Sequence, residues 1–249
     1  MDGQTVGIKT SAIEEKCQAF ETLVIYSSTL GARFAPYLPQ SLELALPGLR
    51  FYFHDGVREA CAMYVSISST TSRITDSTLF RAARLTPILL ACGKSSGTLT
   101  HPMVSVTFQQ LISCISTESD SSFLASLYKC FADALLIVGG PTALAPDFVA
   151  GIMDATKRQL QVLADRRKAR AARSAVGTLA GQDGDGDGDR DVEDEDLALL
   201  EEMEDFALED MGKMLVYFDK DHPLLVAVAS VRNLAVAKSD NDDDGDSEG

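Results

Sequence analysis

Apolar residues recur at helical spacing along most of the chain, and the strict alternation of a half-buried strand is rare. The first apolar stripe lies between Ser11, a suitable N-cap, and Gly31, a suitable stop. Its positions are Ile13, Cys17, Phe20, Leu23 and Leu30. Further helices are predicted at about 36–53, from Val57 onward, and at about 100–115, 120–138, 146–173 and 196–218.

The connections between these helices are short, which favours antiparallel neighbours. The helices that start near Ala12, Gly56 and Ser121 behave as equivalent members of helix pairs, at separations of 44 and 65 residues. A period of about 40–47 residues built from helix pairs is typical of HEAT and armadillo repeats. The predicted fold is therefore an all-α HEAT-repeat α-solenoid of about three and a half repeats.

The segment 64–84 interrupts this pattern, because it is rich in Ser and Thr and has no strong apolar face. Joining Met63 to Leu85 would restore a separation of 44 residues. It would also continue one helical stripe through Val57, Ala60, Cys61, Leu85, Ile88, Leu89 and Cys92. We interpret the segment as a foreign insertion, such as a retained intron whose splice donor is translated as Val65-Ser66. A natural loop between helices is the alternative.

The predicted organisation has five parts. They are an N-terminal segment at 1–10, helical repeats at 11–173 with the atypical insertion, an acidic Gly/Asp-rich flexible loop at 174–196, further helices at 197–236 and an acidic disordered tail at 237–249. With 249 residues and 45% apolar content, the chain is expected to be mostly folded.

The formal charge of −15 is regional. Residues 183–210 hold fifteen Asp and Glu against one Arg, and residues 239–249 hold six more acids, whereas 1–182 carry a net charge of +3. A nucleic-acid binder normally presents a basic face, so this distribution favours basic protein partners, with no direct nucleic-acid binding.

Five cysteines without CxxC spacing lie in apolar stretches, which is typical of reduced core thiols in a cytosolic or nuclear protein. They are Cys17, Cys61, Cys92, Cys114 and Cys130. The first ten residues lack the apolar region of a signal peptide, and no apolar run approaches 18 residues. Neither secretion nor membrane insertion is predicted.

The stretch DGDGDGDRDVED, residues 183–194, is similar in spacing to a calcium-binding loop. The eighth position is Arg190 where an apolar residue is required, and the twelfth is Asp194 rather than a bidentate Glu. A metal site is therefore not expected there. Two readings stay open: a flexible linker, or an acidic loop that binds a partner.

Other candidate chemistry is weak. His54, His101 and His222 have no Cys partners at ligand spacing, and no nucleophile, base and orienting acid can be assembled. Gly139-Gly140-Pro141 lacks the residues of a phosphate-binding loop. The basic run 157–173 is expected to be a solvated helix end that balances the acidic block, with a nuclear-localisation signal or nucleic-acid site as the alternative. No enzyme activity and no cofactor are predicted.

At LRFYFHDGVREACAM, followed by LTPILLACGK, the chain resembles the karyopherin-β, or importin-β, nuclear transport receptors, nearest to the importin-five-like subgroup. The step Asp55, Gly56, Val57 and Arg58 matches the HEAT turn between the outer and inner helix. The likeness runs from about Ser11 to Leu234 and includes an acidic insertion late in the chain. Because such receptors are several times longer, the chain resembles a central-to-late fragment.

The resemblance implies a non-catalytic segment of a nuclear import receptor, shuttling between cytoplasm and nucleus. Its implied partners are basic cargo proteins, Ran GTPase and nucleoporins. The residues expected to bind a partner are those of the acidic loop and the following helix: Asp183, Asp185, Asp187, Asp189, Asp191, Glu193, Asp194, Glu195, Asp196, Glu201 and Glu202. The alternative is a HEAT-repeat scaffold, or a truncated gene product without transport activity.

Overall fold

The computed structural model describes residues 10–51, 57, 58, 61, 85–180 and 190–234, with the side chains of 10, 174–180 and 190–195 excepted. This part of the chain contains helices and no strand. The α-helices are α1 Thr10–Leu30, α2 Leu38–Gly48, α4 Leu85–Ser96, α5 His101–Thr117, α6 Ser121–Val138, α7 Pro146–Ala180, α8 Arg190–Phe218 and α9 Leu224–Arg232. Two short 3₁₀ helices, Gly31–Tyr37 and Pro141–Ala143, precede α2 and α7.

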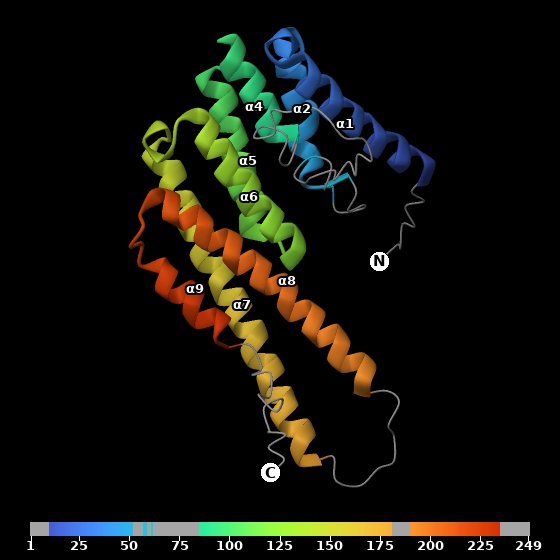
Figure 1. Ribbon diagram of the computed structural model, residues 1–249, viewed down its shortest axis with the longest axis vertical. Helices are drawn as coiled ribbons and strands as arrows, with labels where there is room; N and C mark the ends of the chain where they lie inside the picture. Colours follow the sequence, from blue (N-terminus) through green and yellow to red (C-terminus); the bar gives the residue numbers. More distant parts are fainter. Residues whose placement is uncertain (1–9, 52–56, 59–60, 62–84, 181–189, 235–249) are drawn as a thin grey trace, which may run out of the picture.

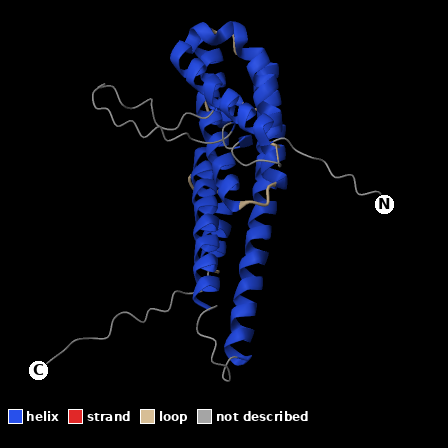
Figure 2. Ribbon diagram, turned by 90° about the vertical axis from the view of Figure 1, so that its right-hand side faces the viewer, coloured by secondary structure: helices blue, strands red, loops and turns tan. Residues whose placement is uncertain are grey.

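The helices form two layers. In one layer α2, α5, α7 and α9 follow each other as neighbours, and in the other layer α1, α4, α6 and α8 do the same. Figure 1 shows the stack running from the blue end of the chain to the red end, with α8 beside α6 and α9 beside α7. Figure 2 gives a second view of these helices. This arrangement confirms the predicted solenoid of helix pairs.

The core lies between the layers and continues from one pair to the next. Phe108 of α5 and Phe131 of α6 are fully buried and meet edge to face at 5.1 Å between ring centroids. Tyr128 is also fully buried, and its hydroxyl lies 3.2 Å from Thr156 Oγ1 of α7. Gln159 of α7 donates to two carbonyl oxygens at the end of α5, so these polar atoms between the pairs are hydrogen-bonded.

Helix α6 is long and apolar enough to span a membrane by length and composition alone. It is, however, packed against α4, α5 and α8, and more than half of it is buried inside the fold. It also carries Lys129 and Asp133 near its middle. These properties are those of the core helix of a repeat.

Arg58 links two successive pairs. Its guanidinium forms a buried ion pair with Glu118 and stacks 3.9 Å from the ring centroid of Phe123 in α6. The other Glu118 oxygen accepts the backbone N–H groups of Ser119 and Asp120. Asp120 in turn caps α6. Of the predicted HEAT turn, Val57 and Arg58 are buried, whereas Asp55 and Gly56 lie outside the described residues.

Several predicted helix bounds need correction. Helix α1 already begins at Thr10, so Ser11 lies inside the helix instead of capping it. The helix predicted at 36–53 is a 3₁₀ turn followed by α2, because the prolines at 36 and 39 favour a new first turn. Helix α2 ends at Gly48, one residue after Pro47. The bounds 100–115 and 120–138 agree with α5 and α6 to within two residues.

The acidic loop predicted at 174–196 is shorter at both ends. Helix α7 continues to Ala180. Helix α8 begins at Arg190, and its first turns are rich in Asp and Glu, which the positive end of the helix dipole stabilises. Residues 181–189 and the predicted tail at 237–249 lie outside the described residues.

The segment 64–84 also lies outside the described residues, but the residues around it bear on the insertion hypothesis. Thr86 Oγ1 donates to the carbonyl oxygen of Cys61 at 3.2 Å. With 64–84 removed, Thr86 would be the fourth residue after Cys61, which is the spacing at which Thr binds a carbonyl of the preceding helical turn. The stripe formed by Val57, Cys61, Leu85, Leu89 and Cys92 is buried throughout. These contacts support one helix interrupted by a foreign segment.

Deleting 64–84 should therefore preserve the fold. The joined helix would stay in phase, and the loss of a loop-closure cost on the order of 2 kcal/mol should leave the unfolding free energy equal or higher. Far-UV circular dichroism and urea unfolding measure both properties.

The matched control is deletion of 65–84, which keeps one extra residue and rotates the α4 stripe by about 100°. It should destabilise the protein. Equal destabilisation by the two deletions would show that the segment is a natural loop between two separate helices.

Candidate partner-binding surface on helix α8

The acidic residues of α8 divide between two faces. Glu204 is buried and Asp205 is half-buried on the face toward α7, whereas Asp196, Glu202 and Glu209 are exposed. The exposed acids alternate with large apolar residues at intervals of three or four positions. We call this face the α8 stripe; it consists of Leu199, Glu202, Phe206, Glu209, Lys213 and Tyr217.

The α8 stripe combines charge with exposed apolar surface. Leu199, Phe206 and Tyr217 are 50%, 53% and 44% exposed, so each leaves a large apolar surface in contact with solvent. Lys213 Nζ bonds to Glu209 at 2.7 Å and to Asp210 at 3.1 Å. These bonds lower the pKa of Glu209 and raise the pKa of Lys213. The stripe is therefore negative at neutral pH and carries aromatic side chains.

The opposite face of α8 is held by Arg167, the largest fully buried side chain in the described part of the chain. Its Nε donates to Glu204 Oε2 at 2.9 Å and its Nη2 donates to Asp205 Oδ1 at 3.0 Å. Its Nη1 donates to the carbonyl oxygen of Arg232 at the end of α9, at 3.1 Å. One guanidinium thus joins α7, α8 and α9.

Arg170 completes this network. Its two terminal nitrogens bond to the two carboxylate oxygens of Glu204, and its Nε lies 4.0 Å from Glu201 Oε1. Such a bidentate pair fixes the planes of both groups. The buried charges of Glu204 and Arg167 are therefore matched inside the fold and are not available to a partner.

The structure places the predicted partner-binding residues in four different settings. Asp183, Asp185, Asp187 and Asp189 lie outside the described residues. Asp191, Glu193, Asp194 and Glu195 belong to the first turns of α8, where side chains are not described. Asp196 and Glu202 are exposed, and Glu202 lies on the stripe. Glu201 is half-buried; its carbonyl accepts a hydrogen bond from Arg167, so it belongs to the internal network.

Sequence reasoning missed Phe206 as an exposed residue and Glu204 as a buried one. The sequence does show that positions 199, 206 and 217 share one helical face. It does not show whether that face is exposed, because this depends on where α6 and α7 lie. Arg167 and Arg170 of the basic run balance the acidic block as expected, but the prediction of a solvated helix end is wrong for these two residues, because α8 packs over them and pairs them with buried Glu204. Other cations of the run are exposed, namely Lys157, Arg158, Lys168 and Arg173.

The cysteines offer little nucleophilic chemistry. Cys61, Cys92, Cys114 and Cys130 are buried, as the sequence predicted, and Cys17 is half-buried. Burial raises the pKa of Cys61 to about 12 and also raises the pKa of Cys92 and Cys114. Such thiols stay protonated at neutral pH and react slowly. Among the described residues, no group of three His, Cys, Asp or Glu side chains is arranged to hold a metal ion.

Comparison with known proteins agrees with the fold. Residues 123–220 match the family model for importin repeat 6. A stretch of 68 residues is 41% identical to importin subunit beta-3 of Saccharomyces cerevisiae, covering 27% of this chain and 6% of that protein.

Solved structures of karyopherin Kap121p superpose on most of the chain. The complex with the SUMO protease Ulp1p gives a TM-score of 0.59 at 21% identity, covering 90% of this chain and 18% of Kap121p. The complex with Nup53p gives 0.60 at 20% identity, and the complex with RanGTP gives 0.55 at 21% identity. Each of these two covers 92% of this chain, and they cover 19% and 20% of Kap121p.

The fold is therefore that of the HEAT-repeat solenoids of karyopherins. The chain matches an importin repeat at residues 123–220 and is similar to a segment of the karyopherin-β proteins. It spans about a fifth of the length of Kap121p and matches a much smaller share of the yeast importin subunit.

Replacing Arg167 by Met should destabilise the protein by about 3–5 kcal/mol, because Glu204 and Asp205 would lose their buried cation. Urea unfolding followed by circular dichroism measures the loss. The control is Lys213→Met, which breaks ion pairs of an exposed lysine and should change stability by less than about 0.5 kcal/mol. Similar small effects of both changes would contradict the central role of Arg167.

Proposed function

We propose that the chain acts as a non-catalytic segment of a nuclear import receptor and binds basic segments of cargo proteins through the α8 stripe. The main observation in support is the pattern on α8: exposed Glu202 and Glu209 alternate with Phe206 and Tyr217, while Glu204 and Asp205 pair with Arg167 and Arg170 inside the fold. An acidic and aromatic face suits a cationic, extended peptide, because carboxylates attract its charges and aromatic rings pack on its aliphatic stems.

Solved complexes of a similar protein support this proposal. Kap121p has been solved bound to Ulp1p, to the extreme C-terminus of the phosphatase Cdc14p, to Ste12p, to Nup53p and to RanGTP. Karyopherins are transport receptors and not enzymes. For this chain, binding of Ran and of nucleoporins, and shuttling between cytoplasm and nucleus, are part of the same proposal.

The stripe lies on the layer formed by α1, α4, α6 and α8. The acidic residues at 183–196 precede it directly along the chain. Their negative field would extend the stripe beyond the first turns of α8 and speed the association of basic partners. Such attraction weakens as salt concentration rises, which separates it from purely apolar binding.

Replacing Glu202 and Glu209 by Gln should weaken binding of a lysine-rich peptide by about threefold to tenfold, since each lost exposed contact is worth up to about 1 kcal/mol. Phe206→Ser should weaken it further and reduce binding that persists at high salt. Fluorescence anisotropy with a labelled peptide, at low and at high salt, measures both effects.

The matched control is Asp154→Asn with Asp165→Asn, which removes the same charge from exposed positions of α7. It should change the affinity by less than about twofold. If the control weakens binding as much as the α8 variant, net charge alone attracts the peptide and the stripe is not the site.

A structural scaffold is the alternative function, because HEAT solenoids serve both purposes. The receptor and scaffold functions predict different responses to the nucleotide that is bound to Ran. A transport-receptor segment that contacts Ran should retain Ran loaded with GTP more than Ran loaded with GDP in a pull-down. Nucleotide-independent retention, or none, would favour a scaffold or an inactive product.

A further inference from the structure

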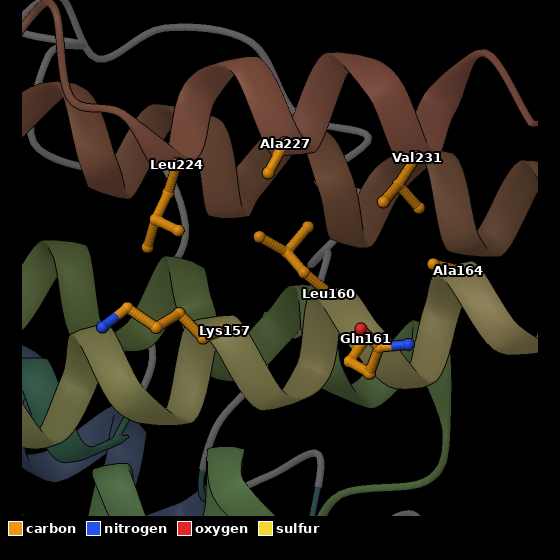
Figure 3. Close-up of a pocket in the computed structure, with 7 residues that line it drawn as sticks. All are labelled: Lys157, Leu160, Gln161, Ala164, Leu224, Ala227 and Val231. Carbon is orange, nitrogen blue, oxygen red and sulfur yellow. The ribbon is translucent and has the colours of Figure 1, made fainter.

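Two concave sites in the described part of the chain border α7, and they differ in the groups that line them. Figure 3 shows the groove between α7 and α9, where Leu224, Ala227 and Val231 of α9 face α7. Lys157 lines this groove and is paired with Asp154. The second site is a cavity of about 420 Å³ between the turn from α5 to α6, α7 and α8, and its lining is mainly polar and charged.

One wall of this cavity is the turn between α5 and α6, formed by Glu118, Ser119 and Asp120. Glu118 and Asp120 have extended backbone, with φ −69° and ψ 135° at the first and φ −84° and ψ 119° at the second. Ser119 lies between them and is exposed. A serine hydroxyl in an exposed, extended connection is accessible to another enzyme.

The opposite wall carries Arg166 of α7, which is half-buried. Its Nη1 donates to the carbonyl oxygen of Ser119 at 2.9 Å. A guanidinium has five N–H donors, so this bond leaves others available. Among the described residues Arg166 forms no ion pair, and its charge therefore lies beside Ser119 without an acidic partner.

The two acids of the turn already have donors of their own. Glu118 pairs with Arg58 and accepts the backbone N–H groups of Ser119 and Asp120. Asp120 accepts two backbone N–H groups of the first turn of α6. These bonds compensate both carboxylates, which reduces their repulsion of a further negative group on Ser119.

The remaining charges near the cavity are also accounted for. Arg170 pairs with Glu204, so neither of them is available to a new group. Asp165 precedes Arg166 in the sequence, but it is exposed and accepts from Gln161 at 2.8 Å. A negative charge added at the turn would therefore meet Arg166 first.

We propose that Ser119 is a phosphorylation site and that Arg166 binds the phosphate. A protein kinase selecting acidic neighbours, here Glu118 and Asp120, would transfer the group from ATP. Ser119 Oγ bonds to the γ-phosphorus, the bond from that phosphorus to the bridging oxygen breaks, ADP leaves, and the hydroxyl proton passes to the kinase. The product carries about two negative charges at neutral pH and three acceptor oxygens for the guanidinium.

The neighbouring hydroxyl groups are less suitable acceptors of the phosphoryl group. Thr117 is the last residue of α5, and its hydroxyl donates to the carbonyl oxygen of Ser113 at 3.1 Å. Ser121 is the first residue of α6 and is half-buried. Ser119 combines exposure, extended neighbours and contact with an arginine.

The phosphate would clamp two successive helix pairs together. Ser119 belongs to the turn of the α5 and α6 pair, whereas Arg166 belongs to α7 of the next pair. Charge-assisted bonds between phosphate and guanidinium are stronger than the bond to a neutral carbonyl. Phosphorylation would thus strengthen one interface of the solenoid reversibly. The inference does not depend on the cargo proposal, because neither residue belongs to the α8 stripe.

The first experiment asks whether the hydroxyl is accessible in the folded protein. The full chain is incubated with ATP and an acid-directed serine kinase, and tandem mass spectrometry locates the phosphate. Ser119 should be modified, and Ser119→Ala should remove that signal. Thr117→Ala is the matched control and should leave modification of Ser119 unchanged. Absence of phosphate from Ser119 would overturn the proposal.

The second experiment measures the coupling between the phosphate and Arg166. Phosphoserine is incorporated at position 119 during synthesis, and urea unfolding compares modified and unmodified protein with and without Arg166→Gln. The phosphate should favour the folded state about fivefold more in the parent than in the Arg166→Gln variant. The matched control is Arg158→Gln, which removes an exposed arginine of α7 and should change the effect of the phosphate by less than about 1.5-fold.

Two outcomes of the second experiment would overturn the role of Arg166. Equal coupling of the phosphate to Arg158 and Arg166 would show that it responds only to the general charge of α7. An equal effect of the phosphate in the parent and in Arg166→Gln would show that the guanidinium does not bind it.

Discussion

The stacking of each helix on its counterpart in the neighbouring pair is the interaction on which this structure depends. A single helix pair cannot bury both of its apolar faces, so α6 needs α4 on one side and α8 on the other. The same holds for α5 and α7 in the other layer. Stability therefore accumulates from one interface to the next, and the polar contacts serve to fix the distance and angle between pairs.

Two arginines fix the distance and angle between helix pairs. Arg58 connects its own helix to the start of α6 through Glu118, and Arg167 connects α7, α8 and α9 through Glu204, Asp205 and a carbonyl of Arg232. Burying such groups is costly unless every partner is present. The internal pairing also sorts the acids of α8, because those used by Arg167 and Arg170 are separated from those that face solvent.

Much of the fold could be predicted from the sequence, because helical spacing and short connections define pairs. Helices α5 and α6 follow the predicted bounds closely. The turn before α2 could not be predicted, since prolines at 36 and 39 permit either a continuous or a broken helix, and only packing of the buried Phe34 and Leu38 decides.

The acidic composition located the candidate site on α8, but it did not show which acidic residues lie on which face of the helix. Glu202 and Glu204 are two positions apart and so lie about 200° apart around the helix, which places one on the stripe and the other against Arg167. Choosing between them requires the position of α7.

The hydrogen bond between Thr86 and Cys61 has a consequence for how such a chain can evolve. A segment that contains a whole number of codons, and whose ends rejoin within one turn of a helix, leaves the reading frame and the neighbouring interfaces intact. Repeat proteins confine a disturbance to adjacent repeats. Insertions of this kind should therefore change folding little, and solenoids can retain them and later use them as new loops.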